Sequence, residues 1–301
     1  SVDDFFREWP IRDLALSPDG NKLAGIYRDG SRFKLVVLDL EDGNKQTYTE
    51  DEQEGWSTAA VHWLNAKRFA VTYFRVFNQF SLYRGNEPFV AVQIFSMGPD
   101  GGNRLDLLTA AREKEKRGRW SAGIQSVIPN DPDHVAVFLS NDEASRLYKV
   151  NLESGAATRI ARGTDATTSF YLSPDGEPLL RLDKVWFTNL VTLYRMDKER
   201  NKWRKVRTYN FAERGEELME DIFALDGESS MLSLERLDGE EYVALHRVDI
   251  ETEAHQATVA AKDGVDLHGT VIDPNREDIV GVTYIDDRLR YAYFDPELQS
   301  V

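Results

Sequence analysis

Ser17-Pro18-Asp19-Gly20 and Ser173-Pro174-Asp175-Gly176 are two copies of one four-residue turn, and each copy lies between two short apolar segments. Proline fixes the first φ of such a turn, aspartate bonds its own backbone, and glycine adopts the positive φ that other residues resist. Less complete versions of the same turn occur at Asn65-Ala66, Asp131-Pro132-Asp133, Asp226-Gly227 and Asp273-Pro274-Asn275.

The turns recur at nearly regular steps along the chain. With Asp19, Asn65, Pro132, Asp175, Asp226 and Pro274 as markers, the steps are 46, 67, 43, 51 and 48 residues. A repeat near about 45 residues with four strands per unit is typical of a β-propeller. We therefore predict an all-β fold, a propeller of four-stranded antiparallel blades. About six blades are visible in the sequence, the last of them incomplete, of an expected seven.

Each repeat has the same internal order of strands. An alternating first strand leads into the turn, and two apolar strands follow, several of them nearly continuous in apolar residues. In five of the units a more polar fourth strand comes next. Continuous apolar strands are typical of sheets covered on both faces, and a polar last strand suits an edge in water. The predicted organisation is an N-terminal segment over residues 1–10 and a propeller over 11–301, with blades at 11–50, 58–109, 122–162, 167–210, 219–261 and, incomplete, 265–301.

The sixth unit stops after its third strand, at Asp295-Pro296 and the tail to Val301. An open ring of blades leaves sheet faces and edges exposed. Two explanations remain: the chain is a fragment of a longer protein, or its N-terminal segment completes the last blade. We expect a fragment.

The second unit is enlarged and departs from the repeat in two places. Its aromatic-rich stretch contains Phe74, Phe77, Phe80, Tyr83 and Phe89. We interpret this stretch as an extended hairpin, with a loop toward a partner domain or a substrate cavity as the alternative. The segment Ala110 to Ser121 interleaves Glu and Lys at helical spacing, which predicts a solvated helix or loop.

Composition limits the partners and the compartment. The net charge of −15 and the pI near 4.9 argue against nucleic acid, because phosphate binding needs a clustered basic surface. The chain has no cysteine, so disulfides and thiolate zinc sites are excluded, and no run approaches the ~20 apolar residues that span a bilayer. The first residues lack a signal-peptide pattern. We expect a periplasmic or secreted protein if a signal peptide was removed, and otherwise a cytoplasmic one.

The sequence does not contain the Gly-x-Ser-x-Gly turn of α/β-hydrolases. The near misses surround Ser57 and Ser121, and both lie at blade boundaries without a strand-then-helix context. The five histidines have no His-Glu-x-x-His spacing and no close pairing, so we interpret each as an ordinary strand or turn residue. These histidines are His62, His134, His246, His255 and His268.

Metal and phosphate motifs are equally lacking. The sequence has no glycine-rich phosphate loop, and Asp39 to Glu50 does not fit the calcium-loop template. The acidic clusters at Glu50–Glu54 and Glu213–Asp221 would attract a cation or a substrate amine, but we interpret them as solvated loops. We therefore assign no catalytic, cofactor-binding or metal-binding residue, and we predict no cofactor.

The segment Leu14 to Ala24 resembles the blade-opening motif of prolyl oligopeptidase-family serine peptidases, and this motif is also common in Tol-system translocation propellers. Other segments are more similar to bacterial peptidases of the dipeptidyl- or acylaminoacyl-peptidase type. They are Phe5-Phe6-Arg7, Asn130 to Val135, Ile279 to Tyr284 and Tyr293 to Glu297. The resemblance covers essentially the whole chain, in order.

In that family, a propeller of about seven blades is followed by an α/β-hydrolase domain that carries Ser, Asp and His. The resemblance implies that this chain is the non-catalytic propeller, which gates and orients peptide substrates for a missing hydrolase domain. The implied partners are the C-terminal hydrolase domain of the same parent chain and a peptide substrate, with homo-oligomers left open. This chain alone is then no enzyme, and its parent is a serine peptidase.

Two other interpretations stay open. The chain could be a stand-alone scaffold propeller that binds proteins, of the Tol-system or WD type. A sugar- or metal-using propeller enzyme is the third option, and it would need clustered acids or histidines at the channel mouth.

Overall fold

The computed structural model describes residues 11–29, 32–48, 56–81, 85–115, 120–210, 222–226, 229–252, 254–276 and 278–300. The chain divides into two compact units. The first comprises Ser1–Val127, Pro132–Asn141 and Arg146–Arg159, and the second comprises Ile128–Asp131, Asp142–Ser145 and Ile160–Val301.

Three antiparallel sheets lie wholly or mostly in the first unit. The first sheet contains β1 (Ile11–Leu16), β2 (Lys22–Asp29), β3 (Arg32–Asp39) and β4 (Lys45–Tyr48). The second contains β5 (Ser57–Asn65), β6 (Arg68–Ser81), β7 (Gly85–Met97) and β8 (Leu105–Asp106). The third contains β9 (Ser121–Val127), β10 (His134–Asn141), β11 (Ala144–Asn151) and β12 (Ala157–Arg162).

Three further antiparallel sheets belong to the second unit. The fourth sheet contains β13 (Thr167–Leu172), β14 (Pro178–Val185), β15 (Leu190–Asp197) and β16 (Lys202–Asn210). The fifth contains β17 (Ile222–Asp226), β18 (Ser230–Glu235), β19 (Ala244–Asp249) and β20 (His255–Ala260). The sixth contains β21 (Leu267–Asp273), β22 (Asp278–Ile285) and β23 (Leu289–Tyr293).

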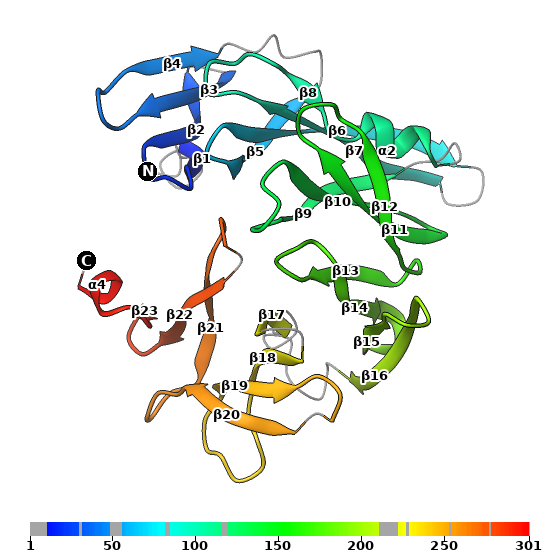
Figure 1. Ribbon diagram of the computed structural model, residues 1–301, viewed down its shortest axis with the longest axis vertical. Helices are drawn as coiled ribbons and strands as arrows, with labels where there is room; N and C mark the ends of the chain where they lie inside the picture. The colour runs from blue at the N-terminus through cyan, green and yellow to red at the C-terminus, as the bar shows by residue number, and fades with distance from the viewer. Residues whose placement is uncertain are drawn as a thin grey trace. The chain divides into compact units, whose positions relative to one another are not determined.

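Within every sheet, neighbouring strands follow one another in the chain, and Figure 1 shows this meander in each blade. The fold is therefore a six-bladed β-propeller with four-stranded antiparallel blades, as the repeat predicts. Among the described residues, the sixth sheet has three strands. A seventh blade stays a prediction.

The two complete Ser-Pro-Asp-Gly turns adopt the conformation that their sequence predicts. The amide of Gly20 donates to the Ser17 carbonyl oxygen at 2.9 Å, and the amide of Gly176 donates to the Ser173 carbonyl oxygen at 2.8 Å. The φ angles of the two glycines are 72° and 84°. In each copy the serine hydroxyl also accepts a backbone amide, from Lys22 or from Glu177. Each turn joins the first and second strands of its sheet.

We expect Gly176→Ala to destabilise the protein more than Gly20→Ala. Both substitutions force alanine into a left-handed conformation, which costs about 1–2 kcal/mol. A Cβ on Gly20 would meet no atom within 4 Å, but one on Gly176 would lie 2.9 Å from Cδ1 of Ile128, which is buried. Urea unfolding of both variants measures the difference, and equal losses would show that the Ile128 side chain yields without cost.

Apolar side chains on the sheet faces form two clusters in each unit. In the first unit, one cluster joins the first two sheets, and the other joins the second and third sheets. In the second unit, one cluster joins the fourth and fifth sheets, and the other joins the fifth and sixth. Consecutive sheets within a unit therefore share a core, which explains why their central strands are nearly continuous in apolar residues.

The aromatic-rich stretch of the second blade is an extended hairpin, as predicted. The strands β6 and β7 pair continuously from Phe69 opposite Met97 to Ser81 opposite Gly85. Near its middle, the Arg75 guanidinium lies 4.6 Å from the centroid of the Phe77 ring.

The charged segment after the second blade is less solvated than its sequence predicts. It begins with the short helix α2 (Thr109–Glu113), in which Ala111 is buried and the Arg112 guanidinium donates to the Val92 carbonyl oxygen at 2.7 Å. The side chain of Glu115 is only 8% exposed and accepts a hydrogen bond from the Tyr148 hydroxyl. Burial and this hydrogen bond raise the pKa of Tyr148 to about 12. The prediction of solvation was wrong here, because a buried anion contacts sheet residues that lie far away in sequence.

The remaining helical elements are short. A 3-10 turn, η1 (Trp186–Thr188), lies between β14 and β15, and α4 (Pro296–Gln299) follows β23 with the Asp295 side chain as its N-cap. In the described part of the chain, no helix has the length and apolar character to cross a membrane.

Candidate functional site

A polar pocket lies in the first unit. It lies at the end of the first three sheets that carries the turns after the first and third strands. Its volume is about 690 Å³. It is lined by Gln46, Asn65, Lys67, Arg68, Gly98, Pro99, Asp100, Asn103, Asp133, Asn151, Leu152 and Glu153. These residues come from the turns β5–β6, β7–β8, β9–β10 and β11–β12 and from strand β4.

The turn between β5 and β6 supplies the two cations of the pocket. The Asn65 carbonyl oxygen Oδ1 accepts the Lys67 amide at 2.8 Å, and Asn65 Nδ2 donates to the Pro132 carbonyl oxygen at 2.7 Å. One asparagine thus shapes its own turn and ties it to the turn of the next sheet. Lys67 is exposed, so its ammonium group is available to a ligand.

The Arg68 guanidinium is held in the pocket wall by three hydrogen bonds. Its Nε donates to Ser96 Oγ at 2.7 Å, and Nη2 donates to the carbonyl oxygens of Ser96 at 3.2 Å and Asn103 at 2.7 Å. Burial lowers the pKa of Arg68, although a guanidinium stays cationic at neutral pH. Arg68 therefore contributes a fixed positive charge, whereas Lys67 contributes a movable one.

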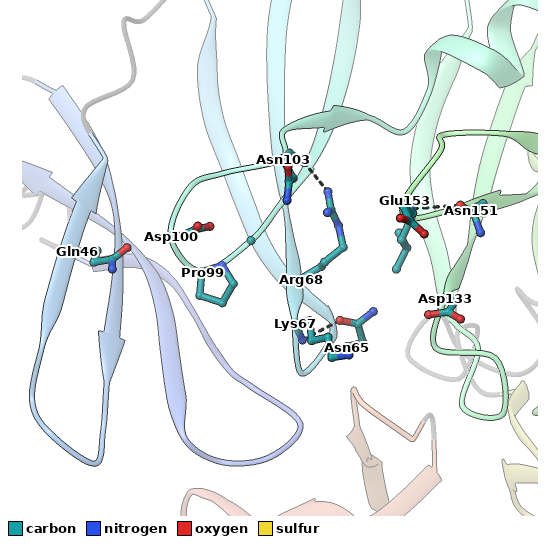
Figure 2. A pocket seen from close by; sticks show the side chains of 12 residues that line it. Gln46, Asn65, Lys67, Arg68, Pro99, Asp100, Asn103, Asp133, Asn151 and Glu153 are labelled. Carbon is teal, nitrogen blue, oxygen red and sulfur yellow. Dashed lines mark hydrogen bonds between the residues drawn. The ribbon is translucent and has the colours of Figure 1, made fainter.

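Carboxylates lie on both sides of these cations. Figure 2 shows Asp100 on one side of Lys67 and Arg68, with Asp133 and Glu153 on the other. The Asp100 carboxylate accepts the Gly102 amide at 2.9 Å and thereby orders its own turn. A pocket that presents both charges suits a polar ligand that also carries both, bound through charge-assisted hydrogen bonds. None of the twelve lining residues is a serine, threonine, cysteine or histidine.

The sequence predicts turns at most of these positions but no site. Asn65, the Gly98–Asn103 segment, Asp133 and Glu153 all belong to predicted turns. The signal that could have revealed the pocket is topological. In a meander, the turn after the first strand and the turn after the third lie at the same end of the sheet. Polar turn residues from neighbouring sheets therefore gather there.

The two near-miss serines lie in strands. Ser57 is the first residue of β5, and Ser121 is the first residue of β9. Neither occupies the strand-to-helix turn that presents a hydrolase nucleophile. The acidic clusters at Glu50–Glu54 and Glu213–Asp221 lie outside the described residues. Among the side chains that the structure does describe, no group of three His, Asp or Glu could hold a metal ion.

His246 and His255 are strand residues, as the sequence predicts, but their side chains lie beside each other. The rings of His246 and His255 lie in edge contact, with centroids 5.1 Å apart. His246 is fully buried and bonds Glu240 Oε2 at 3.0 Å and Thr258 Oγ1 at 3.3 Å. In the β19–β20 register, Thr258 lies opposite His246, and His255 lies opposite Val248, two residues further along β19.

Because His62 is buried, we expect the stability of the protein to depend on pH. Burial lowers the pKa of His62, an effect that the Asp13 carboxylate opposes, and its Nε2 is buried without a hydrogen-bond partner among the described residues. The unfolded chain binds a proton near pH 6.5, whereas the folded ring resists it. The stability from this neutral ring is therefore complete above about pH 6.5 and is lost as the pH falls toward the lower folded-state pKa.

In the wild type, the free energy of unfolding should decrease between about pH 7.5 and about pH 5, and we expect this decrease to be smaller in His62→Gln. The matched control is His268→Gln, because His268 is exposed on β21. Urea midpoints at both pH values measure the effect. The same slope in the wild type and in His62→Gln would contradict the assignment.

Searches against models of protein families and against curated proteins find no match. Among solved structures, dipeptidyl peptidase 4 of Porphyromonas gingivalis is similar, with a TM-score of 0.55, 10% identity, and coverage of 98% of this chain and 47% of that chain. An oligogalacturonate lyase in complex with manganese is similar with a TM-score of 0.51, 13% identity, and coverage of 95% and 77%. An uncomplexed acylaminoacyl peptidase of Pyrococcus horikoshii gives a TM-score of 0.49, 12% identity, and coverage of 97% and 47%.

At these identities the likeness shows the β-propeller fold alone. This chain spans about half the length of the dipeptidyl peptidase that it matches. A peptidase and a lyase are both similar to it, so the fold by itself does not select a reaction.

Proposed function

We propose that this chain is the non-catalytic β-propeller domain of a prolyl oligopeptidase-like serine peptidase. In this proposal, a C-terminal α/β-hydrolase domain of the same protein supplies the nucleophile, the base and the oxyanion donors. The propeller covers that active site, excludes large folded proteins and orients peptide substrates.

The observation that carries the proposal is the extent of the structural likeness. The similarity includes 98% of this chain but 47% of the dipeptidyl peptidase, so more than half of that enzyme has no counterpart here. The blade-opening segment Leu14 to Ala24 and the ordered segments at 130–135, 279–284 and 293–297 add support from sequence. The pocket adds support from charge, because a peptide with free ends carries both charges that its lining would attract.

A serine-directed fluorophosphonate probe tests the proposal. We expect no labelling of the 301-residue chain, because Ser57 and Ser121 begin strands and occupy no nucleophile turn. We expect clear labelling of the product of the complete gene, in which the codons after Val301 encode a Gly-x-Ser-x-Gly turn followed by an Asp and then a His.

Two control results distinguish the propeller domain of a peptidase from a stand-alone protein-binding propeller. A stop codon directly after Val301, or a complete product that does not label, would overturn the proposal and favour a protein-binding propeller. Labelling of the 301-residue chain that disappears in Ser57→Ala or Ser121→Ala would overturn its non-catalytic assignment.

A further inference from the structure

The polar pocket of the first unit contains a half-buried cation, Arg68, whose charge is not compensated by the residues around it. Nε and Nη2 of Arg68 donate only to uncharged oxygen atoms, those of Ser96 and Asn103. A guanidinium has five N–H donors, so the two on Nη1 remain. Within the part of the chain that the structure describes, neither these N–H groups nor the Lys67 ammonium has a hydrogen-bond or ion-pair partner.

The arginines that are buried in the described part of the chain are paired differently. Arg181 lies 2.8 Å from a carboxylate oxygen of Asp183, and Arg146 lies 3.6 Å from one of Glu115. A charge that is removed from water is normally paired with an opposite charge. Arg68 lacks such a pair although three carboxylates line the same pocket. The guanidinium can therefore accept an anion from outside the chain.

The surroundings of Arg68 hold its guanidinium in one place. Ser96 is completely buried, and both its hydroxyl and its carbonyl oxygen accept hydrogen bonds from Arg68. Asn103 adopts a left-handed φ of 53°, and its carbonyl oxygen accepts the third bond, which Figure 2 shows. A side chain that is already fixed loses little conformational freedom when a ligand binds.

Charge balance in the pocket indicates which kind of anion it would accept. The lining has two cations and three carboxylates, those of Asp100, Asp133 and Glu153, and its net charge is therefore −1. A dianion such as phosphate would meet stronger repulsion there than a monoanion. Among the described residues, the carboxylates of Asp133 and Glu153 have no hydrogen-bond donor, so they can accept one from the ligand.

We propose that this pocket binds a small organic carboxylate, whose carboxylate group contacts Nη1 of Arg68 and the Lys67 ammonium. The rest of the ligand carries an ammonium or hydroxyl donor for Asp133 and Glu153. The pocket volume of about 690 Å³ suits a small molecule. A divalent cation fits poorly, because Lys67 and Arg68 lie between Asp100 and the other two carboxylates (Figure 2).

This inference does not depend on the proposed function, because all lining residues belong to the first unit and no hydrolase residue takes part. Calorimetric titration of the 301-residue chain at low ionic strength tests it. The probes are glycylglycine, which adds an ammonium group to a carboxylate, and gluconate, which adds hydroxyl groups. We expect at least one of them to bind with a Kd of about 1 mM or lower. Glycinamide, which has no carboxylate, should not bind.

The two probes distinguish the possible sources of the ligand. Binding of glycylglycine alone would indicate an amino acid or peptide, and binding of gluconate alone would indicate a sugar acid. Either result supports the inference. Binding of neither carboxylate at about 10 mM would overturn it, and so would tighter binding of inorganic phosphate than of both carboxylates. Because labelling by fluorophosphonate is measured separately, these failures leave the proposed function standing.

Three variants assign the binding to the pocket. Lys67→Gln removes a charge but no hydrogen bond that the structure describes, and we expect about fivefold weaker binding. Arg68→Lys keeps the charge but loses the planar fork, and we expect about tenfold weaker binding. The matched control is Lys34→Gln, which makes the same charge change on β3 outside the pocket and should bind like the wild type.

Circular dichroism establishes that each variant is folded before it is titrated. If Arg68→Lys does not fold, Lys67→Gln and its control still decide the result, because the Lys67 side chain forms no described contact that the fold needs. Affinities for the carboxylate that are equal in the wild type, Lys67→Gln and Lys34→Gln would overturn the assignment of the ligand to this pocket.

Discussion

Replacing Asp183 with alanine is expected to lower the free energy of unfolding by about 3–5 kcal/mol, the usual cost of leaving a buried charge without its partner. Asp183 and Arg181 are each 6% exposed, and Arg181 Nη2 lies 2.8 Å from Asp183 Oδ2. The same carboxylate accepts the Thr167 hydroxyl at 2.6 Å and the Thr164 hydroxyl at 3.2 Å. The substitution therefore removes three hydrogen bonds at one buried site.

Among the described residues, two aromatic rings also lie beside Arg181. Its guanidinium lies 4.1 Å from the centroid of the Tyr194 ring and 5.3 Å from that of Trp203. Its Nε is buried and, among the described residues, has no hydrogen-bond partner. Cation–π contacts of this kind contribute about 0.5–2 kcal/mol, which does not replace a buried carboxylate.

Two further variants separate the lost charge from the lost volume. Asp183→Asn keeps the shape and part of the hydrogen bonding, so we expect a smaller loss than for alanine. The double variant Arg181→Met with Asp183→Leu removes both charges and should be more stable than Asp183→Ala, because a paired apolar replacement leaves no buried ion. Urea unfolding measures all three. A loss below about 1 kcal/mol for Asp183→Ala would show that water reaches Arg181.

The parts of the fold that could be predicted from sequence are those with local causes. The turns at Ser17–Gly20 and Ser173–Gly176 need proline, aspartate and a glycine of positive φ in fixed order, so their positions, and the blade repeat with them, follow from the chain. Burial on both faces of the central strands could be predicted as well, because it follows from runs of several apolar residues within one strand.

The errors occur where distant residues decide the outcome. The fourth strand of the second blade, β8, ends at Asp106, whose carboxylate accepts the Leu108 amide at 2.8 Å just before α2 begins. Glu115 was predicted to be solvated because its contact with Tyr148, 33 residues away, leaves no trace in the local pattern. The pocket has the same origin, because residues of four separate turns line it only after the sheets have formed.

Replacing Trp63 with alanine is expected to cost about 3–5 kcal/mol of unfolding free energy, the range for deleting a large buried aromatic side chain. Trp63 lies in β5, is 2% exposed, and packs with Ile26 of the first sheet and Phe69 of its own sheet. Its ring centroid is 5.4 Å from that of Phe69, and its Nε1 donates to the Ala15 carbonyl oxygen at 2.8 Å. One side chain therefore joins two blades by packing and by a hydrogen bond.

The conservative variant Trp63→Phe keeps most of the ring but loses the donor to Ala15, so we expect a smaller cost of about 1–2 kcal/mol. Leu40→Ala is the matched control, because Leu40 is 48% exposed and its truncation should change stability by about 0.5 kcal/mol or less. Urea unfolding with a tryptophan-independent probe such as circular dichroism compares the three variants. A Trp63→Ala cost no larger than that of Leu40→Ala would contradict the packing of the first two blades, on which the propeller assignment of the first unit depends.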